Sequence, residues 1–224
     1  MNWFDSVRKT VEGKHLLQHS FYQRWSAGEL TREELSEYAR EYYHYTLAFP
    51  TFLSAVHSQS GDLALRQSVL ENLIEEERGE ENHPELWLRF CDALGLDRDA
   101  VLTSSPSAPT RQLIEVMRTL CRDGDSHEGL AALYAYESQV PAVAHTKIEG
   151  LRKFYGIEDS RDISFFTTHL VADVLHAQTS EEWLGRLCDT DARKQSATAA
   201  VEATLEALYG FLDGVNHPAS VMVH

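Results

Sequence analysis

Cysteine is scarce in this sequence and none of it is closely paired. Cys91, Cys121 and Cys188 are the only three cysteines in 224 residues, and no CxxC pair occurs. A disulfide framework needs cysteines in an oxidising compartment, and a thiolate zinc site needs them at short spacing. We therefore expect neither, and we predict three reduced thiols in the core.

Positive charge is also scarce, because 20 Lys and Arg stand against 35 Asp and Glu and leave a formal net charge of -15. Such a chain repels phosphate backbones and anionic lipid surfaces, so nucleic acid is not an expected partner. No apolar run approaches the ~20 residues that a membrane-spanning helix needs, and the first residues lack the apolar segment of a signal peptide. We expect no membrane association and a cytoplasmic location.

The chain has no repeat of fixed period and no linker-like cluster of proline and glycine that would divide it. A length of 224 residues with 43% hydrophobic residues suffices for one domain with a full core. No segment shows the alternation of a β-strand. The sequence predicts an all-α, single-domain helical bundle over residues 1–224, with a frayed tail at 214–224.

Capping and stop signals predict where the helices begin and end. Thr31 with Glu34 forms a capping-box pattern, and Gly28 ends the helix before it. Thr179 with Glu182 forms a second capping-box pattern. The expected helices span 31–58 with a kink at Pro50, 62–80, 84–94, 110–122, 126–154 with an interruption at Pro141, 162–178 and 191–212. Residues 95–109 are expected to form a loop.

The strongest functional signal lies in the helix expected at 162–178. Its apolar stripe continues through His169, Asp173 and His176 at steps of four and three residues, which places all three on one face. A single core histidine is usually only hydrogen-bonded. Two imidazoles and a carboxylate on one face, however, are a set of nitrogen and oxygen ligands suited to iron, manganese or zinc.

Acidic residues and a histidine also interrupt the apolar stripe of the helix expected at 62–80. Continued past Leu73, this stripe falls on Glu76, Glu80, His83 and Trp87. Seven residues turn a helix by nearly two full turns, so Glu76 and His83 would point the same way. The run EEERGEE is equally typical of a solvated charged face, and spacing does not separate Glu76 from Glu80.

Glu137 falls inside the inner stripe of the helix expected at 126–154. Taken alone, a buried glutamate is most often paired with an arginine or lysine. Together with the other residues it completes three carboxylates and three imidazoles. These six groups can hold two divalent ions and offset three of their four charges.

Tyrosines form a second group of interest. One face of the helix from Thr31 carries Leu35, Tyr38, Tyr42, Tyr45 and Phe49. Such a stripe usually belongs to the core, but phenols close to an oxygen-activating metal can be oxidised. Tyr22 and Tyr136 add two more phenols, and Tyr136 directly precedes Glu137.

Lys147 follows Glu137 by ten residues and would lie roughly 80° away from it on one continuous helix. The ordinary interpretation is a surface lysine. If Lys147 is buried beside metal ions, desolvation and nearby positive charge lower its pKa and leave a neutral, nucleophilic amine.

These residues carry a family resemblance that covers residues 15–212. The segment HSFYQRWSAGELTREELSEYAREYY resembles the N-terminal helix pair of the haem-oxygenase-like superfamily, which includes TenA thiaminases and PqqC. Glu76, His83, Glu137 and the segment HLVADVLH resemble more narrowly its dimetal oxidases, and in particular the CADD-type para-aminobenzoate synthases. The resemblance implies a haem-oxygenase-like bundle and a homodimer, and it selects Glu76 rather than Glu80.

For function, the resemblance implies an oxygen-dependent dimetal oxidase that makes para-aminobenzoate for folate synthesis from its own side chains. Two metal ions, Fe/Fe or Mn/Fe, would be held by the six ligands, with molecular oxygen and an external reductant as co-substrates and no free organic substrate. Tyr22 would give the ring and Lys147 the nitrogen. Tyr38 and Tyr136 would relay the oxidation or replace Tyr22.

Two alternatives stay open at this point. One is a dimetal oxidase of the same fold that acts on a free fatty acid or amino acid, and the other is an interaction protein that binds a partner through its acidic surface. A thiaminase is disfavoured, because GLAALYAYESQVP lacks the TenA-type cysteine. Cofactorless oxidation of the PqqC kind is disfavoured, because it gives no reason for six inward ligand residues.

Overall fold

The computed structural model describes residues 2–216, and in that range all regular structure is helical. In chain order the elements are α1 (Trp3–Gly13), the 3₁₀ turn η1 (Leu16–Gln18), α2 (Ser20–Ala27), α3 (Arg32–Gln59), α4 (Leu63–Glu77), α5 (His83–Ala93), α6 (Arg98–Thr103), α7 (Ala108–Arg122), α8 (Ser126–Glu137), α9 (Val140–Phe154), α10 (Ser164–Leu187) and α11 (Asp191–Val215). The predicted all-α bundle is confirmed.

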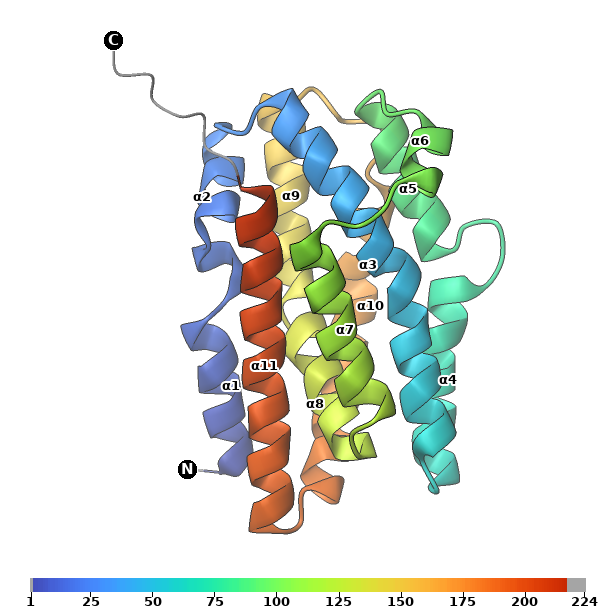
Figure 1. The fold of residues 1–224 in the computed structure, drawn as a ribbon, viewed down its shortest axis with the longest axis vertical. Helices are drawn as coiled ribbons and strands as arrows, with labels where there is room; N and C mark the ends of the chain where they lie inside the picture. The colour runs from blue at the N-terminus through green and yellow to red at the C-terminus, as the bar shows by residue number, and fades with distance from the viewer. Residues whose placement is uncertain (1, 217–224) are drawn as a thin grey trace.

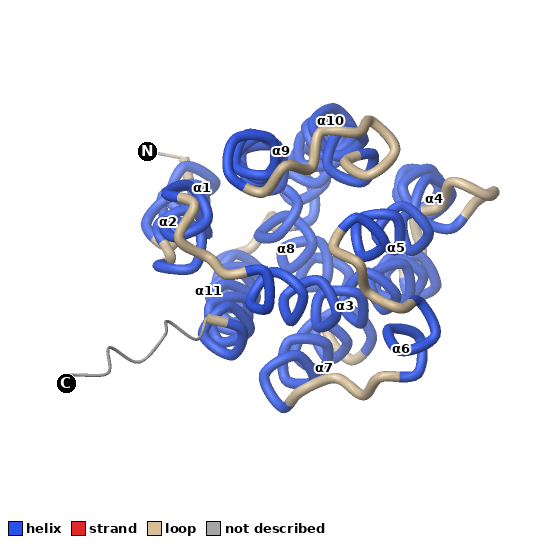
Figure 2. Tube along the Cα trace, turned by 90° about the horizontal axis from the view of Figure 1, so that it is seen from above, coloured by secondary structure: helices blue, strands red, loops and turns tan. Residues whose placement is uncertain are grey.

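Helix α8 lies at the centre of the bundle (Figures 1 and 2), with α3, α7, α10 and α11 packed around it, and α9 continues beyond its end. Every residue from Gly129 to Glu137 is buried, so this helix is enclosed on all sides rather than along one stripe. A polar group near its end has to find its partners inside the protein. Glu137, the last residue of α8, is such a group.

Several predicted boundaries agree with the structure. Gly28 adopts a left-handed backbone with φ of 71° and ends α2, and Thr31 and Glu34 form the capping box that starts α3. Helix α3 continues through Pro50 to Gln59. Cys91, Cys121 and Cys188 are buried free thiols, as predicted.

Other boundaries were predicted wrongly. The expected loop at 95–109 contains α6, because Asp97 accepts a hydrogen bond from the amide of Ala100 and caps that helix. The helix expected to end at residue 80 already ends at Glu77, and Gly79 in the following turn has φ of 83°. The expected tail begins inside α11, which ends at Val215, and residues 217–224 of that tail lie outside the described residues.

Two long helices also differ from the prediction. The helix expected at 126–154 is divided into α8 and α9, with Pro141 in the first turn of α9, where its missing N–H costs nothing. In contrast, α10 continues through Thr179 to Leu187, so the capping-box pattern at 179–182 lies inside a helix. The face that carries His169 to His176 is therefore held in the first half of a long helix.

Helix α2 packs closely against α9. The indole N–H of Trp25 donates a hydrogen bond of 3.3 Å to the backbone carbonyl of Lys147. A Cβ atom on Gly150 would come within 2.6 Å of the same indole ring. Glycine at this position therefore allows the two helices to approach, and the contact fixes Tyr22 of α2 relative to Lys147 of α9.

None of the helices within residues 2–216 combines the length and the apolar character that crossing a membrane requires.

Candidate metal centre

Three helices bring a first set of possible metal ligands together. Glu76 at the end of α4, His83 at the start of α5 and His169 in α10 place ligand atoms within 4.8 Å of one another, and all three are buried. Nδ1 of His83 lies 2.7 Å from Oε2 of Glu76, but the two groups are not aligned for a hydrogen bond. Side chains that converge in this way without bonding to one another suit a shared cation.

A second set lies beside the first and shares α10 with it. Glu137 at the end of α8 meets Asp173 and His176, again with ligand atoms within 4.8 Å of one another. Nδ1 of His176 is 3.5 Å from Oδ1 of Asp173 and 3.8 Å from Oε1 of Glu137. A small cavity of about 10 Å³ touches Glu76 and His169 of the first set as well as Asp173 of the second, which shows that the two sets are neighbours.

The structure thus brings together all six residues predicted from the sequence, although one reason given for the prediction was wrong. Glu76 and His83 do not share a helix, because a turn at 78–82 separates α4 from α5. They meet because α4 and α5 follow one another along α3 (Figure 1), so that the end of α4 lies close to the start of α5, where Asn82 caps the helix just before His83. Glu80 is exposed on the intervening turn.

In His169 and in His176, one ring nitrogen already has a polar partner outside the cluster. The other ring nitrogen is therefore the one that can bind a metal. Nδ1 of His169 lies 2.6 Å from the carbonyl oxygen of Phe165, so it carries the proton and leaves Nε2 to face the site. Nε2 of His176 lies 3.2 Å from Oε2 of Glu75, which leaves Nδ1 facing Glu137 and Asp173. Such outer partners orient histidine ligands in metal sites.

Burial gives this cluster unusual electrostatics. Burial raises the pKa of Glu137 to about 8 and that of Asp173 to about 6. Burial alone would lower the pKa of His176, but the carboxylates of Asp173 and Glu137, which lie 3.5 Å and 3.8 Å from its Nδ1, raise it to about 9. Carboxylates that hold protons so strongly are stabilised in their charged form by a nearby cation.

Asn72 belongs to this site and was missed by the sequence interpretation. Its Nδ2 donates a 2.7 Å hydrogen bond to Oε1 of Glu137, whereas Oε2 of Glu137 is buried without a partner. Asn72 lies one helical turn before Glu76 on α4, so the position in the stripe could have indicated it. It was missed because an asparagine carries no charge to flag it.

Lys147 is buried with a 3% exposed side chain and makes no ion pair with any residue between 2 and 216. Its Nζ donates a 2.6 Å hydrogen bond to the hydroxyl of Tyr38, and the hydroxyls of Tyr38 and Tyr22 are hydrogen-bonded in turn. Nζ lies 5.6 Å from the centre of the Tyr22 ring. Burial lowers the pKa of Lys147 to about 7, so a large share of this amine is neutral at neutral pH.

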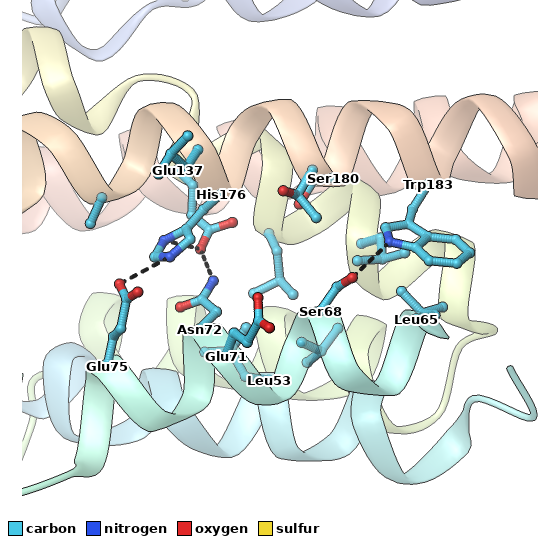
Figure 3. Close-up of a pocket in the computed structure, with 16 residues that line it drawn as sticks. Leu53, Leu65, Ser68, Glu71, Asn72, Glu75, Glu137, His176, Ser180 and Trp183 are labelled. Atoms are coloured by element: carbon cyan, nitrogen blue, oxygen red, sulfur yellow. Dashed lines mark hydrogen bonds and ion pairs between the residues drawn. The ribbon is translucent and has the colours of Figure 1, made fainter. Parts of the chain in front are cut away.

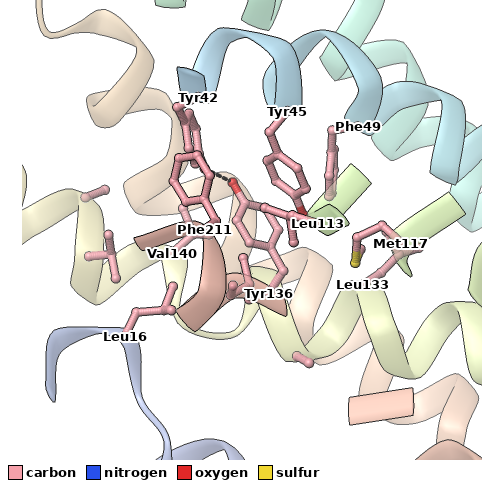
Figure 4. Close-up of a cluster of buried hydrophobic side chains, with 14 of the residues drawn as sticks. Leu16, Tyr42, Tyr45, Phe49, Leu113, Met117, Leu133, Tyr136, Val140 and Phe211 are labelled. Atoms are coloured by element: carbon pink, nitrogen blue, oxygen red, sulfur yellow. Dashed lines mark hydrogen bonds between the residues drawn. The ribbon is translucent and has the colours of Figure 1, made fainter. Parts of the chain in front are cut away.

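A further phenol, Tyr42, connects this group to the metal ligands. The hydroxyls of Tyr42 and Tyr136 form a short hydrogen bond (Figure 4), and the rings of Tyr42 and Tyr38 lie 5.5 Å apart. Tyr136 lines the small cavity that also touches Asp173. The phenols therefore form a continuous path from the candidate ligands to Lys147, and the connection is Tyr42, a member of the predicted tyrosine stripe to which no individual role was assigned.

A third group of possible ligands, at Asp125, His127 and Glu128, has a simpler explanation. Asp125 and Glu128 form the capping box of α8, and the imidazole of His127 bonds to the hydroxyl of Ser196. We assign no metal to it.

The comparison with known families fits this geometry. Residues 36–209, which contain all six candidate ligands, match the family described as iron-containing redox enzymes. The chain belongs to this family. Buried ligand atoms without partners, namely Oε2 of Glu137, Oδ2 of Asp173 and Nδ1 of His176, are what a metal-binding member of it requires.

Two relatives of this iron-containing redox enzyme carry a more specific name than the family does. It is 44% identical to the 4-aminobenzoate synthase of Nitrosomonas europaea, over 94% of this chain and 89% of the relative. It is 39% identical to the 4-aminobenzoate synthase of Chlamydia trachomatis serovar D, over 98% of this chain and 94% of the relative. The predicted resemblance to para-aminobenzoate synthases is confirmed, since 4-aminobenzoate is the same compound.

A solved structure supports the fold. A domain of unknown function with a haem-oxygenase-like fold from Shewanella denitrificans superimposes with a TM-score of 0.79 at 23% identity, covering 94% of this chain and 89% of that one. The predicted haem-oxygenase-like bundle is confirmed.

The position of Glu80 yields a direct test of the ligand set in this enzyme. We expect Glu76→Gln to lose at least one bound metal ion and Glu80→Gln to keep full occupancy, because Glu76 is buried in the site and Glu80 is exposed. Elemental analysis of both purified variants measures this. Metal loss in Glu80→Gln with full occupancy in Glu76→Gln would overturn the assignment.

Proposed function

We propose that this enzyme makes 4-aminobenzoate in an oxygen-dependent reaction that consumes its own Tyr22 and Lys147. The observation that carries the proposal is the buried lysine, which is hydrogen-bonded to one phenol, within 5.6 Å of another ring and connected by phenols to a cluster of metal-ligand residues. The names of the relatives at 44% and 39% identity support 4-aminobenzoate as the product.

We propose Glu76, His83, Glu137, His169, Asp173 and His176 as the ligands of two metal ions, either Fe/Fe or Mn/Fe. When bound, these ions would activate molecular oxygen, which is the oxidant. An external reductant would supply the remaining electrons. The mixed carboxylate and imidazole donors suit both metals. The six side chains contribute three negative charges, so they offset most of the charge of two divalent ions.

Tyr22 is proposed as the source of the carbon. The ring and Cβ of a tyrosine account for all carbon atoms of 4-aminobenzoate, with Cβ oxidised to the carboxylate after cleavage of the Cα–Cβ bond. Oxidation of Cβ to the carboxylate consumes one molecule of oxygen and leaves a glycine residue at position 22. The nitrogen of Lys147 then replaces the phenolic oxygen in the para position, and that oxygen leaves as water. The Cε–Nζ bond breaks as Cε is oxidised to an aldehyde, and a second oxygen molecule accepts these two electrons and two more from the external reductant. Both groups come from one chain, so no organic substrate is needed.

Lys147 fits its role because it can lose its proton inside the protein. A pKa near 7, caused by desolvation, makes the neutral amine accessible, whereas an arginine would stay charged. Tyr38 accepts the hydrogen bond of the amine and holds Nζ toward the Tyr22 ring. Tyr38, Tyr42 and Tyr136 together offer a path for oxidation between the ligands and Tyr22.

The space around Lys147 also favours an internal substrate. The cavity that touches Tyr22 and Lys147 has a volume of about 20 Å³, and one water needs roughly 10–15 Å³. A free aromatic or aliphatic substrate therefore has no room beside the amine. The alternative function is a dimetal oxidase that acts on a free fatty acid or amino acid. Separately, the homodimer implied by the family resemblance stays a prediction.

The test is a single-turnover balance. Metal-loaded protein exposed to oxygen and reductant, with no organic substrate added, is expected to give about one 4-aminobenzoate per chain and then stop. Protein carrying ring-deuterated tyrosine and side-chain nitrogen-15 lysine should give doubly labelled product, and peptide mapping should show changes at Tyr22 and Lys147. Unlabelled product, or many turnovers by intact chains, would favour the alternative oxidase.

A further inference from the structure

A cavity between α4 and α10 leads from the surface to the second set of ligands (Figure 3). Its volume is about 180 Å³, and its inner end is lined by Asn72, Glu137 and His176. Glu71 and Glu75 on α4 are exposed and line the outer part of the same cavity. The proposed reaction leaves this cavity without a role.

Size distinguishes this cavity from the other two that touch proposed reactive residues. The cavity beside Glu76 and His169 measures about 10 Å³ and the one beside Lys147 about 20 Å³, so neither admits more than about one water. The cavity between α4 and α10, at about 180 Å³, has room for several waters. Of these three, it alone can admit an ion that still carries part of its hydration shell.

The lining groups select the charge of what enters. Buried atoms without a partner at the inner end are Oδ1 of Asn72, Oε2 of Glu137 and Nδ1 of His176, and each can present a lone pair. The two glutamates of the outer part are negatively charged when ionised. Lone pairs inside and carboxylates outside attract a cation and repel an anion.

We propose that divalent metal ions reach the Glu137–Asp173–His176 set through the cavity between α4 and α10, and that the carboxylate of Glu75 attracts them into it. Glu75 is suited to this step because it is 51% exposed and yet its Oε2 lies 3.2 Å from Nε2 of His176. It can bind an ion from solvent and already contacts a proposed ligand. The inference rests on the proposed ligand set but not on the proposed product.

The first test narrows the cavity. Ala172 of α10 lines it, and we expect Ala172→Phe to slow both the uptake of Co²⁺ by metal-free protein and its release to a chelator by the same factor, about tenfold or more. A barrier on the route changes both rates equally and leaves the equilibrium occupancy unchanged. Stopped-flow visible absorption of the bound Co²⁺ measures both rates, and Val171→Phe, at a 69% exposed neighbour, is the control.

The second test removes a charge without adding bulk and does not depend on Ala172→Phe folding. Glu75→Gln is expected to slow Co²⁺ uptake by about threefold to tenfold, as loss of local attraction would, with a weaker dependence of the rate on salt. Glu77→Gln, an exposed acid on the same helix that does not line the cavity, should keep the normal rate.

The outcomes separate this inference from the proposed function. Unchanged Co²⁺ uptake rates in both cavity variants would overturn the route. So would an altered equilibrium occupancy in Ala172→Phe if uptake and release are not slowed by the same factor. If the unaltered protein binds no metal at all, the ligand set fails and the proposed function fails with it. Slower uptake in the cavity variants together with normal controls supports the route.

Discussion

Replacing Lys147 with arginine is expected to abolish 4-aminobenzoate formation while two metal ions stay bound. The native side chain is buried and carries no countercharge in an ion pair, so its pKa falls to about 7 and the amine can become neutral. Arginine stays protonated in proteins and has no nucleophilic lone pair. The variant therefore keeps the hydrogen-bond donor toward Tyr38 but lacks the nitrogen that leaves the chain.

Product analysis by mass spectrometry and elemental analysis of the same sample measure this result. Lys153→Arg is the matched control, because Lys153 is exposed on the same helix, and it should form product normally. Product formed by Lys147→Arg in the normal amount would reject Lys147 as the nitrogen donor. Loss of metal together with product would show that the substitution disturbs the ligands instead.

The same lysine sets an expected pH dependence. Below its pKa of about 7 the amine is increasingly protonated and loses its lone pair. The single-turnover rate of 4-aminobenzoate formation should therefore fall as the pH drops through 7. Rates measured between pH 6 and 8 on protein loaded with metal beforehand test this, because prior loading separates amine protonation from metal uptake.

Replacing Asp173 with alanine is expected to remove at least one of the two metal ions and all product. Its carboxylate is buried between Glu137 and His176 and shares a helical face with both proposed histidine ligands of α10. His169→Ala should behave in the same way. Elemental analysis and product analysis measure both effects, with Glu182→Ala, an exposed acid on α10, as the control.

Metal-free Asp173→Ala should fold as well as the metal-free parent. Burial raises the pKa of Asp173 to about 6, above the ordinary value of 3.8, so above pH 3.8 the buried acid opposes folding and its removal costs little. Equal thermal unfolding of the two metal-free proteins, measured by circular dichroism, would therefore show that metal loss comes from a missing ligand. Full metal occupancy in Asp173→Ala would contradict the proposed site.

The shared face of the three candidate ligands on α10 was predicted for a physical reason that holds in the structure. His169, Asp173 and His176 follow the period of one uninterrupted helix, and periodicity needs no tertiary information. Glu76 and His83 were paired by the same rule across a turn where it does not apply, and they meet because that turn brings the start of α5 close to the end of α4. The family resemblance, rather than spacing, separated Glu76 from Glu80.

What the sequence could not predict depends on contacts between distant segments. Asn72 matters because its amide meets Glu137, and Tyr42 matters because its hydroxyl meets that of Tyr136. The burial of Lys147 also required the packed core, since a lysine in isolation is most often exposed. The cavity between α4 and α10 arises from how two helices lie side by side and leaves no pattern in either one.

Gly150, a residue without a side chain, helps to set the geometry of the proposed reacting pair. Its missing Cβ lets the Trp25 ring lie against α9, and that contact sets how far Tyr22 stands from the lysine amine. A single added methyl group would push α2 outward while leaving every metal ligand, phenol and amine chemically intact. The spacing of the proposed reacting pair therefore depends on a contact between α2 and α9 in which none of the candidate metal ligands takes part.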